Sequence, residues 1–252
     1  MKVRTYLFLA SLAFLLFGCV KDPVVPDAPA IPEYPILLKV QPLWNGVPFD
    51  KTVIYHNALG QRVLLTQVKF YLADAQLIGD GTTAQLFDVE LLDLTNGPVE
   101  RMLHAARGDY RSMHLGFGLP YDLNHTDPTL YPVDDPLGAF SGMLWSWASL
   151  HRFLLFNGRY DTDGTATGIP PFLFSIETGL DTCYRQRTVP LVLDVEEGDT
   201  ARLTLEIDIA RFFFNSTDTF DLSQGSQWHG AIDQVSIALK LSDLASGAIH
   251  AH

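Results

Sequence analysis

Hydrophobic and polar residues alternate along most of the chain, which is the period-2 pattern of strands with one buried face. This alternation predicts strands over residues 36–43, 63–78, 85–94, 109–119, 150–156, 172–176, 189–195 and 201–209. Turns rich in Gly, Asn and Asp separate several of these strands, as at 79–81, 96–98 and 197–199. Short strands joined by such turns predict an all-β domain, an antiparallel β-sandwich or a barrel-like sheet.

One segment breaks the strand pattern near the C-terminal end. Between residues 230 and 246 the apolar residues have roughly helical spacing, and Gly247 follows as a stop signal. The sequence therefore predicts a C-terminal helix on the β domain. Residues 124–140 hold several aspartates and prolines and predict a long packing or functional loop.

The first residues have the form of an export signal. Lys2 and Arg4 precede an apolar run over 6–17, which is too short to span a bilayer and ends at Gly18-Cys19. A small residue before a cysteine at this distance resembles a bacterial lipoprotein cleavage site, so residues 1–18 are expected to be removed and Cys19 lipidated. The alternative is an ordinary signal peptide with an incidental cysteine.

Residues 19–35 are expected to form a linker. Five prolines lie three residues apart there, which favours an extended polyproline II segment that holds the domain off a membrane. The remaining 36–252 are expected to form one β domain. With a lipid on Cys19, the predicted location is the outer membrane, facing the periplasm or the cell surface.

Charge and motifs exclude several functions. The formal net charge of −12 argues against nucleic-acid binding, which needs concentrated Lys and Arg. Once Cys19 is lipidated, only Cys183 is left, so neither a disulfide nor a cysteine zinc site is expected. No zinc-protease helix, phosphate loop, dinucleotide fingerprint or nucleophile elbow is present. Their absence argues against an enzyme, and we expect a protein that is not one. The alternative is an enzyme with a dispersed site of scattered carboxylates, such as a carbohydrate-active sandwich.

Histidines and tryptophans are the candidate chemistry. Imidazole suits copper, but the histidines are dispersed, so any metal site must assemble from different strands. Trp145 and Trp147 are two residues apart, which in a strand would place both rings on one face. Trp228-His229 is a second Trp-His neighbourhood. The alternatives are histidines that are satisfied structurally and tryptophans that fill the core.

Four stretches resemble a known family in order along the chain. They are 68–74, 108–120, 142–158 with its Met-x-Trp-x-Trp segment, and 205–222. They resemble the MbnP-like family of periplasmic or lipid-anchored copper-binding proteins, which are related to the partner encoded beside methanobactin genes.

The resemblance implies a copper site outside the cytoplasm. In that family a di-haem peroxidase-like partner oxidises one tryptophan to kynurenine, and the modified residue binds copper together with histidines. Carried to this chain, it implies His229, His56 and His151 as metal ligands and Trp145, Trp147 or Trp228 as the oxidised residue.

Two positions depart from the family pattern. Many relatives have histidine where this chain has Ser175, and Gly-Tyr where it has Leu150-His151. His151 is then a substitute ligand, or the copper site is lost. The alternative function is a lipoprotein whose β-sandwich binds a non-metal ligand or a partner and whose copper site has decayed.

Overall fold

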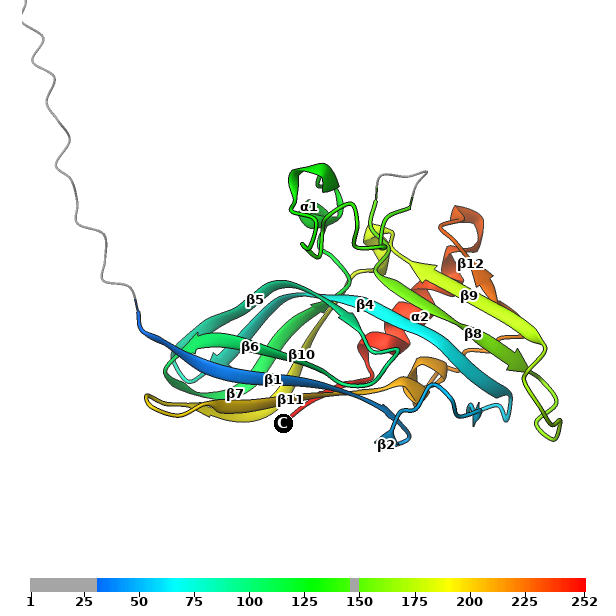
Figure 1. The fold of residues 1–252 in the computed structure, drawn as a ribbon, viewed down its shortest axis with the longest axis horizontal. Helices are drawn as coiled ribbons and strands as arrows, with labels where there is room; N and C mark the ends of the chain where they lie inside the picture. The colour runs from blue at the N-terminus through cyan, green and yellow to red at the C-terminus, as the bar shows by residue number, and fades with distance from the viewer. Residues whose placement is uncertain (1–30, 146–149) are drawn as a thin grey trace, which may run out of the picture. The chain divides into compact units, whose positions relative to one another are not determined.

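The computed structural model describes residues 31–145 and 150–252 (Figure 1). The predictions for the signal peptide, for Cys19 and for Trp147 lie outside the described residues. Strand β1 begins at Glu33, within the last three residues of the range expected to be linker. Among the described residues no helix is long and apolar enough to cross a membrane.

The first sheet is built on β1. Its parallel neighbour is β11, with Ile36 opposite Ala201, and β6 and β2 pair with β1 antiparallel. The short last strand pairs with β11. The strands of this sheet are β1 (Glu33–Trp44), β2 (Val47–Pro48), β6 (Val99–Ala106), β11 (Ala201–Asp208) and β13 (Ile249–Ala251).

The second sheet is built on β4, which is long enough to pair along its length with β3, β5, β7 and β8. Strand β10 adds to β7, and β9 and β12 extend the sheet beyond β8, the last pair being parallel. Its strands are β3 (Tyr55–His56), β4 (Arg62–Gly79), β5 (Thr82–Asp93), β7 (Gly108–Phe117), β8 (Leu154–Asp161), β9 (Phe172–Thr178), β10 (Arg185–Val195) and β12 (Gln227–Trp228).

The core fills the space between the two sheets. Alternate residues of β1 (Ile36, Leu38, Val40) are buried, as are Leu203, Leu205 and Ile207 of β11. Each such side chain contributes about 1.5–3 kcal/mol by leaving water. Phe156 of β8 packs on Phe212 and Phe213 of the 3₁₀ turn Ile209–Phe213, with ring centroids 5.3 Å apart in both pairs.

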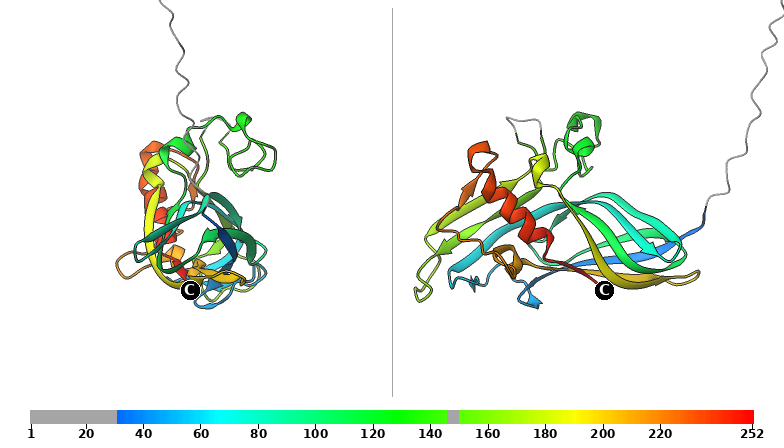
Figure 2. Two further views of the ribbon diagram at one scale, coloured as in Figure 1. Left: turned by 90° about the vertical axis from the view of Figure 1, so that its left-hand side faces the viewer. Right: turned by 180° about the vertical axis from the view of Figure 1, so that it is seen from behind.

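Helix α2 (Val235–Ser246) covers one face of the β8–β9 end of the second sheet (Figure 2). A 3₁₀ turn (Ile232–Gln234) leads into it, and its buried side includes Ala238, Leu241 and Leu244. The opposite face of β8 and β9 is left uncovered by this helix, as Figure 1 shows with α2 behind the strands. That face carries the candidate site.

The predicted fold class is confirmed in its main features. The chain is mostly β, with two sheets packed together and one C-terminal helix. The β1–β11 and β9–β12 pairs are parallel, so the sheets are mixed and not purely antiparallel as expected. Strands β6 and β13 were not predicted, because their patterns are short and weakly alternating.

Trp145 does not lie in a strand, so the condition for placing its ring and that of Trp147 on one strand face is not met. From Phe117 to Leu154 the chain forms a long connection that contains α1 (Tyr121–Asn124) and a 3₁₀ turn (Pro128–Leu130). Near Trp145 it holds only an isolated bridge between Leu144 and His151. Strand β8 therefore begins at Leu154, four residues later than the alternation indicated.

Candidate functional site

Strand β9 positions the first functional side chain. Phe174, Ile176 and Thr178 are buried against the core, so the intervening Ser175 and Glu177 lie on the other face. Strand β12 runs parallel beside it, with Gln227 opposite Ser175 and Trp228 opposite Ile176. The residue after β12, His229, is thereby brought next to Glu177.

Two tryptophans pack together beside this carboxylate. The rings of Trp145 and Trp228 meet edge to face, 6.1 Å between centroids at an interplanar angle of 71°, and both residues are 2 % exposed. Gly179 makes room for Trp145, because a Cβ there would lie 2.7 Å from the Trp145 ring and 2.4 Å from the carbonyl oxygen of His151.

Three groups converge on one oxygen of Glu177. The Trp145 indole Nε1 donates to Glu177 Oε2 at 3.0 Å, His229 Nδ1 lies 3.3 Å from the same oxygen, and Arg152 Nε lies 2.9 Å from it. We call these residues, with Trp228, the Glu177 cluster. An indole, an imidazole and a guanidinium thus share one carboxylate at the surface of the sheet.

Arg152 neutralises Glu177 without a well-aligned hydrogen bond. Its Nε is within ion-pair distance, but the N–H does not point at the oxygen, and Nε has no hydrogen-bond partner among the described residues. Its Nη1 donates to the carbonyl oxygen of Gly142 at 3.2 Å. The pair is therefore an electrostatic contact between two largely buried side chains.

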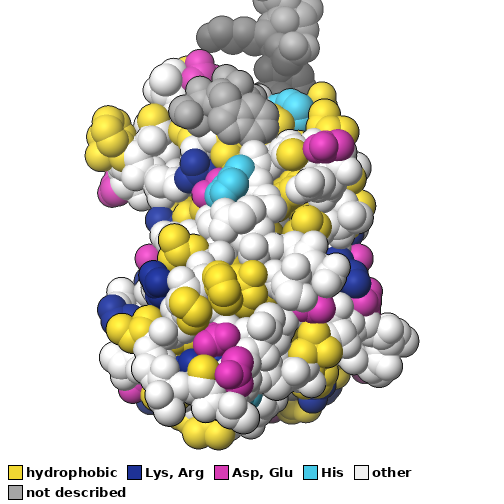
Figure 3. All heavy atoms as spheres, turned by 90° about the vertical axis from the view of Figure 1, so that its right-hand side faces the viewer, with side chains coloured by type: hydrophobic (Ala, Val, Ile, Leu, Met, Phe, Trp, Pro, Cys, Tyr) yellow, Lys and Arg dark blue, Asp and Glu magenta, His cyan; other side chains and the backbone are white. Residues whose placement is uncertain are grey.

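The cluster is open to solvent on the His229 side. The His229 side chain is 48 % exposed and that of Glu177 14 %. On the face seen in Figure 3, histidine, basic and acidic side chains adjoin one another above a group of hydrophobic side chains. A small ion from solvent can therefore reach the imidazole without opening the core.

A ladder of polar side chains crosses the sheet beside the cluster. Ser175 Oγ donates to Asn157 Oδ1 at 2.9 Å, and Asn157 Nδ2 donates to Gln67 Oε1 at 2.8 Å. Gln227 is the neighbour of Ser175 on β12, and its Oε1 is 3.4 Å from His229 Nε2. Ser175 is thus two residues from Glu177 on the same face, about 7 Å away along the strand.

His151 is not brought to this cluster. It is fully buried, with Nε2 3.2 Å from the carbonyl oxygen of Leu137 and Nδ1 3.4 Å from that of Asn124. Its ring meets Tyr71 edge to face at 6.1 Å. Both ring nitrogens of His151 face backbone carbonyls of the 118–153 connection and not the Glu177 cluster, and its role as a ligand stays a prediction.

His56 lies at the opposite end of the sheet. Its Nε2 is 3.1 Å from the carbonyl oxygen of Gly164, in the turn between β8 and β9. That turn is six residues along β9 from Glu177, about 20 Å at strand spacing. The expected set of His229, His56 and His151 does not assemble. Of these three histidines, His229 is the one that lies beside another side chain able to bind a metal, the carboxylate of Glu177.

The described residues hold no group of three His, Cys, Asp or Glu side chains that could share a metal ion. His229 and Glu177 supply two donors. Sequence reasoning missed Glu177 and Arg152. A signal was present for Glu177, since it is the one charged residue of β9.

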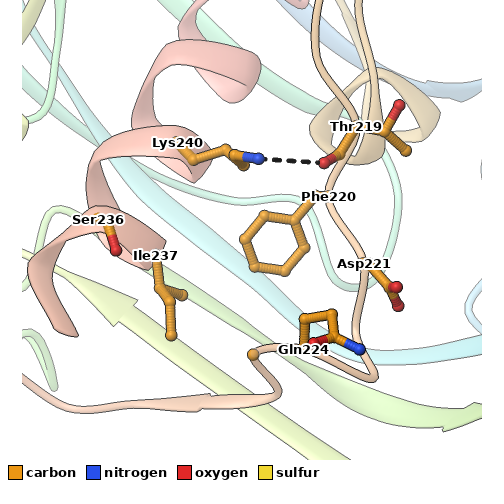
Figure 4. Close-up of a pocket in the computed structure, with 8 residues that line it drawn as sticks. Thr219, Phe220, Asp221, Gln224, Ser236, Ile237 and Lys240 are labelled. Carbon is orange, nitrogen blue, oxygen red and sulfur yellow. Dashed lines mark hydrogen bonds between the residues drawn. The ribbon is translucent and has the colours of Figure 1, made fainter.

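A separate hollow of about 340 Å³ lies on the α2 side of the sheet (Figure 4). Phe220 and Ile237 form its apolar wall, and Lys240 donates to the carbonyl oxygen of Thr219 at 3.3 Å. Lys240 also pairs with Asp218 at 2.8 Å. The hollow has no histidine in its lining and takes no part in the Glu177 cluster.

The fold and the cluster define a class: a β-sandwich of two mixed sheets with a buried tryptophan pair beside a surface imidazole and carboxylate. A family model described as MbnP matches residues 33–230. The chain belongs to the MbnP family.

No curated protein matches the sequence. Among solved structures, MbnP from Methylosinus trichosporium is similar, with 16 % identity and a TM-score of 0.49. The alignment covers 80 % of this chain and 82 % of that one.

Proposed function

We propose that this chain is an extracytoplasmic lipoprotein that binds copper for homeostasis or uptake. The observation that carries the proposal is the convergence of Trp145 and His229 on one oxygen of Glu177. Imidazole nitrogen and carboxylate oxygen are donors that Cu(II) accepts. Membership in the MbnP family supports this assignment.

Two donors make an incomplete site, and an oxidised tryptophan would complete it. Of the two candidate tryptophans that the structure describes, Trp145 directs its indole nitrogen at Glu177, whereas Trp228 Nε1 donates to the carbonyl oxygen of Ala231 at 2.8 Å. Conversion of Trp145 to kynurenine would open the five-membered ring and leave an aryl amine and a ketone near His229. In this proposal a di-haem peroxidase-like partner performs the oxidation, and the chain is its substrate, not an enzyme.

Copper titration against a competing chelator tests the ligands. We expect His229→Ala to weaken copper binding at least about tenfold, a loss of about 1.4 kcal/mol or more. His125→Ala is the matched control, because His125 is also a half-exposed histidine beside a carboxylate, with Nε2 3.0 Å from Asp181 Oδ2. Equal copper affinity in His229→Ala and the unaltered protein would overturn the assignment.

Peptide mass spectrometry tests the modified residue. In protein produced together with its genomic neighbours, we expect the peptide with Trp145 to lose one carbon and gain one oxygen. Trp145→Phe should abolish that change and Trp228→Phe should keep it. A modified peptide at another tryptophan would refute the choice of Trp145 and leave the copper test of His229 unaffected.

Failure of the unaltered protein to bind copper at micromolar concentration, with the fold intact, would favour the alternative of a decayed site. Ser175 is the observation in its favour, since its hydroxyl is bonded to Asn157 and offers no imidazole. The lipid anchor has its own test. Cys19→Ala should move the protein from the membrane fraction to the soluble fraction, and an unchanged distribution would contradict the anchor.

A further inference from the structure

The segment 121–141 stands apart from the sheets and has its own surface chemistry. It belongs to the connection between β7 and β8, which is far longer than the few residues usual between antiparallel strands. Figure 2 shows it in green, projecting from the body of the domain, and α1 is its first part. We call it the acidic excursion. Long ordered connections of this kind are commonly functional.

Side chains from the body hold the excursion in place. Tyr71 of β4 donates to the carbonyl oxygen of Pro136 at 2.6 Å, and Lys69 of β4 donates to that of Ser141 at 2.7 Å. His151 contacts the carbonyl oxygen of Leu137. Burial raises the pKa of Tyr71 far above its usual value, so its hydroxyl stays a donor at neutral pH. The excursion is therefore ordered before anything binds to it.

Its outward side chains are large and apolar. Tyr121, Leu130, Val133 and Phe140 are each between 63 % and 79 % exposed. Leaving such side chains in water forgoes about 1.5–3 kcal/mol apiece, and several together on one ordered segment mark an interaction surface. Val133 and Phe140 border a hollow of about 460 Å³ against β4, β5 and β6, whose lining is mostly polar and includes Lys69, Glu90 and Arg101.

The charges of the excursion are all negative. It contains Asp122, Asp127, Asp134 and Asp135, and no Lys or Arg occurs between Arg111 and Arg152. None of the four aspartates makes an ion pair within the described part of the chain. The amide and hydroxyl of Thr129 lower the pKa of Asp127, which keeps it ionised.

We propose that the acidic excursion is a docking surface for a protein whose contacting face is basic and carries apolar side chains that pack on the exposed Leu130 and Phe140. Unpaired carboxylates around exposed apolar groups are complementary to such a face. A second copy would bring the same four carboxylates together, and an anionic membrane would repel them. Docking at this surface does not require copper binding, so the docking proposal and the proposed function are tested independently.

Site-specific crosslinking in the native host identifies the partner. A photoreactive phenylalanine analogue is placed at Leu130 or at Phe140, and at Val192 as a control. Val192 is 71 % exposed on β10, so it matches the test sites in exposure. We expect one protein adduct from positions 130 and 140 and none from 192. Adducts only to lipid, only to a second copy of the chain, or equally from all three positions would overturn the proposal.

Binding to the purified partner then tests the chemistry. We expect Asp134→Lys/Asp135→Lys to weaken binding about tenfold or more at low salt, and Leu130→Ser/Phe140→Ser to weaken it at both low and high salt. Glu196→Lys/Glu197→Lys is the matched charge control on the β10–β11 turn, away from the excursion. An equal loss in the control, or no loss in either test variant, would show that docking takes place elsewhere.

Discussion

A histidine, a carboxylate and an arginine lie near each end of β9, in two different arrangements. At one end are His229, Glu177 and Arg152. At the hairpin end are His56, Asp161 and Arg62. There Arg62 Nη1 lies 3.3 Å from Asp161 Oδ2, with both side chains largely buried, and Arg62 also donates to the carbonyl oxygen of Gly168.

The two carboxylates differ in how many of their oxygens already have a partner and in whether one of those partners is an imidazole. Asp161 Oδ1 accepts from the amide of Asp163 and Oδ2 meets Arg62, while His56 turns to a carbonyl oxygen. All three contacts of Glu177 go to Oε2, and one of them is an imidazole. The hairpin end is a buried structural ion pair, whereas the Glu177 end places a half-exposed imidazole against a largely buried carboxylate. Residue types alone do not distinguish the two.

Replacing each arginine by methionine should lower the free energy of unfolding much more at the Arg62–Asp161 pair than at the Glu177 cluster. Arg62→Met leaves Asp161 buried without its counter-charge and is expected to cost about 3–5 kcal/mol of unfolding free energy. Arg152→Met leaves Glu177 with the Trp145 N–H and His229, so the expected loss is about 1 kcal/mol. Urea unfolding at neutral pH measures both. Similar losses in the two variants would contradict the comparison.

Substitution of His151 should affect stability and not copper affinity, and substitution of His229 should affect copper affinity and hardly stability. His151→Ala removes a fully buried ring that faces two carbonyl oxygens, and we expect a loss of about 2–3 kcal/mol with unchanged copper affinity. His229→Ala removes a half-exposed side chain and should change stability by about 0.5 kcal/mol or less. Thermal unfolding and copper titration on the same samples test this. Reduced copper affinity in a fully folded His151→Ala would restore His151 as a ligand.

The β class and the helix followed from local patterns, because period-2 and helical spacings report which face is buried. The site could not be predicted from such patterns, because its residues lie far apart in the sequence and meet only in the folded structure. Glu177 and His229 meet only through the parallel β9–β12 pair, and parallel pairing leaves no mark in either short strand. The surroundings of His151 could not be predicted either, because the carbonyl oxygens that face its ring belong to Asn124 and Leu137, 27 and 14 residues away along the chain.

Added methyl groups test how tightly each end is packed. Gly179→Ala places a Cβ 2.7 Å from the Trp145 ring, and Gly164→Ala places one 2.7 Å from the carbonyl oxygen of Gly60. Both should cost about 1–3 kcal/mol by overpacking. Only Gly179→Ala should also alter tryptophan fluorescence and near-ultraviolet circular dichroism. An unchanged tryptophan signal would mean that the Trp145–Trp228 pair is not held by this glycine.

The smallest expected change in free energy comes from adding a ligand. Ser175→His places an imidazole on the face of Glu177, two residues along β9 and beside Gln227. It gives up the hydroxyl bond to Asn157, at about 0.5–1.5 kcal/mol of stability. In return, a third donor near His229 should raise copper affinity about tenfold, or about 1.4 kcal/mol.

Leu173→His is the matched control for that gain. Residue 173 lies on the same face of β9 but four residues from Glu177, about 13 Å away and toward the hairpin. Its imidazole is too far from His229 to share an ion with it, so the affinity should stay that of the unaltered protein. Equal gains from positions 173 and 175 would indicate nonspecific binding by any added surface histidine. A gain at 175 alone would place the copper site at the Glu177 end of β9, where imidazole and carboxylate already meet.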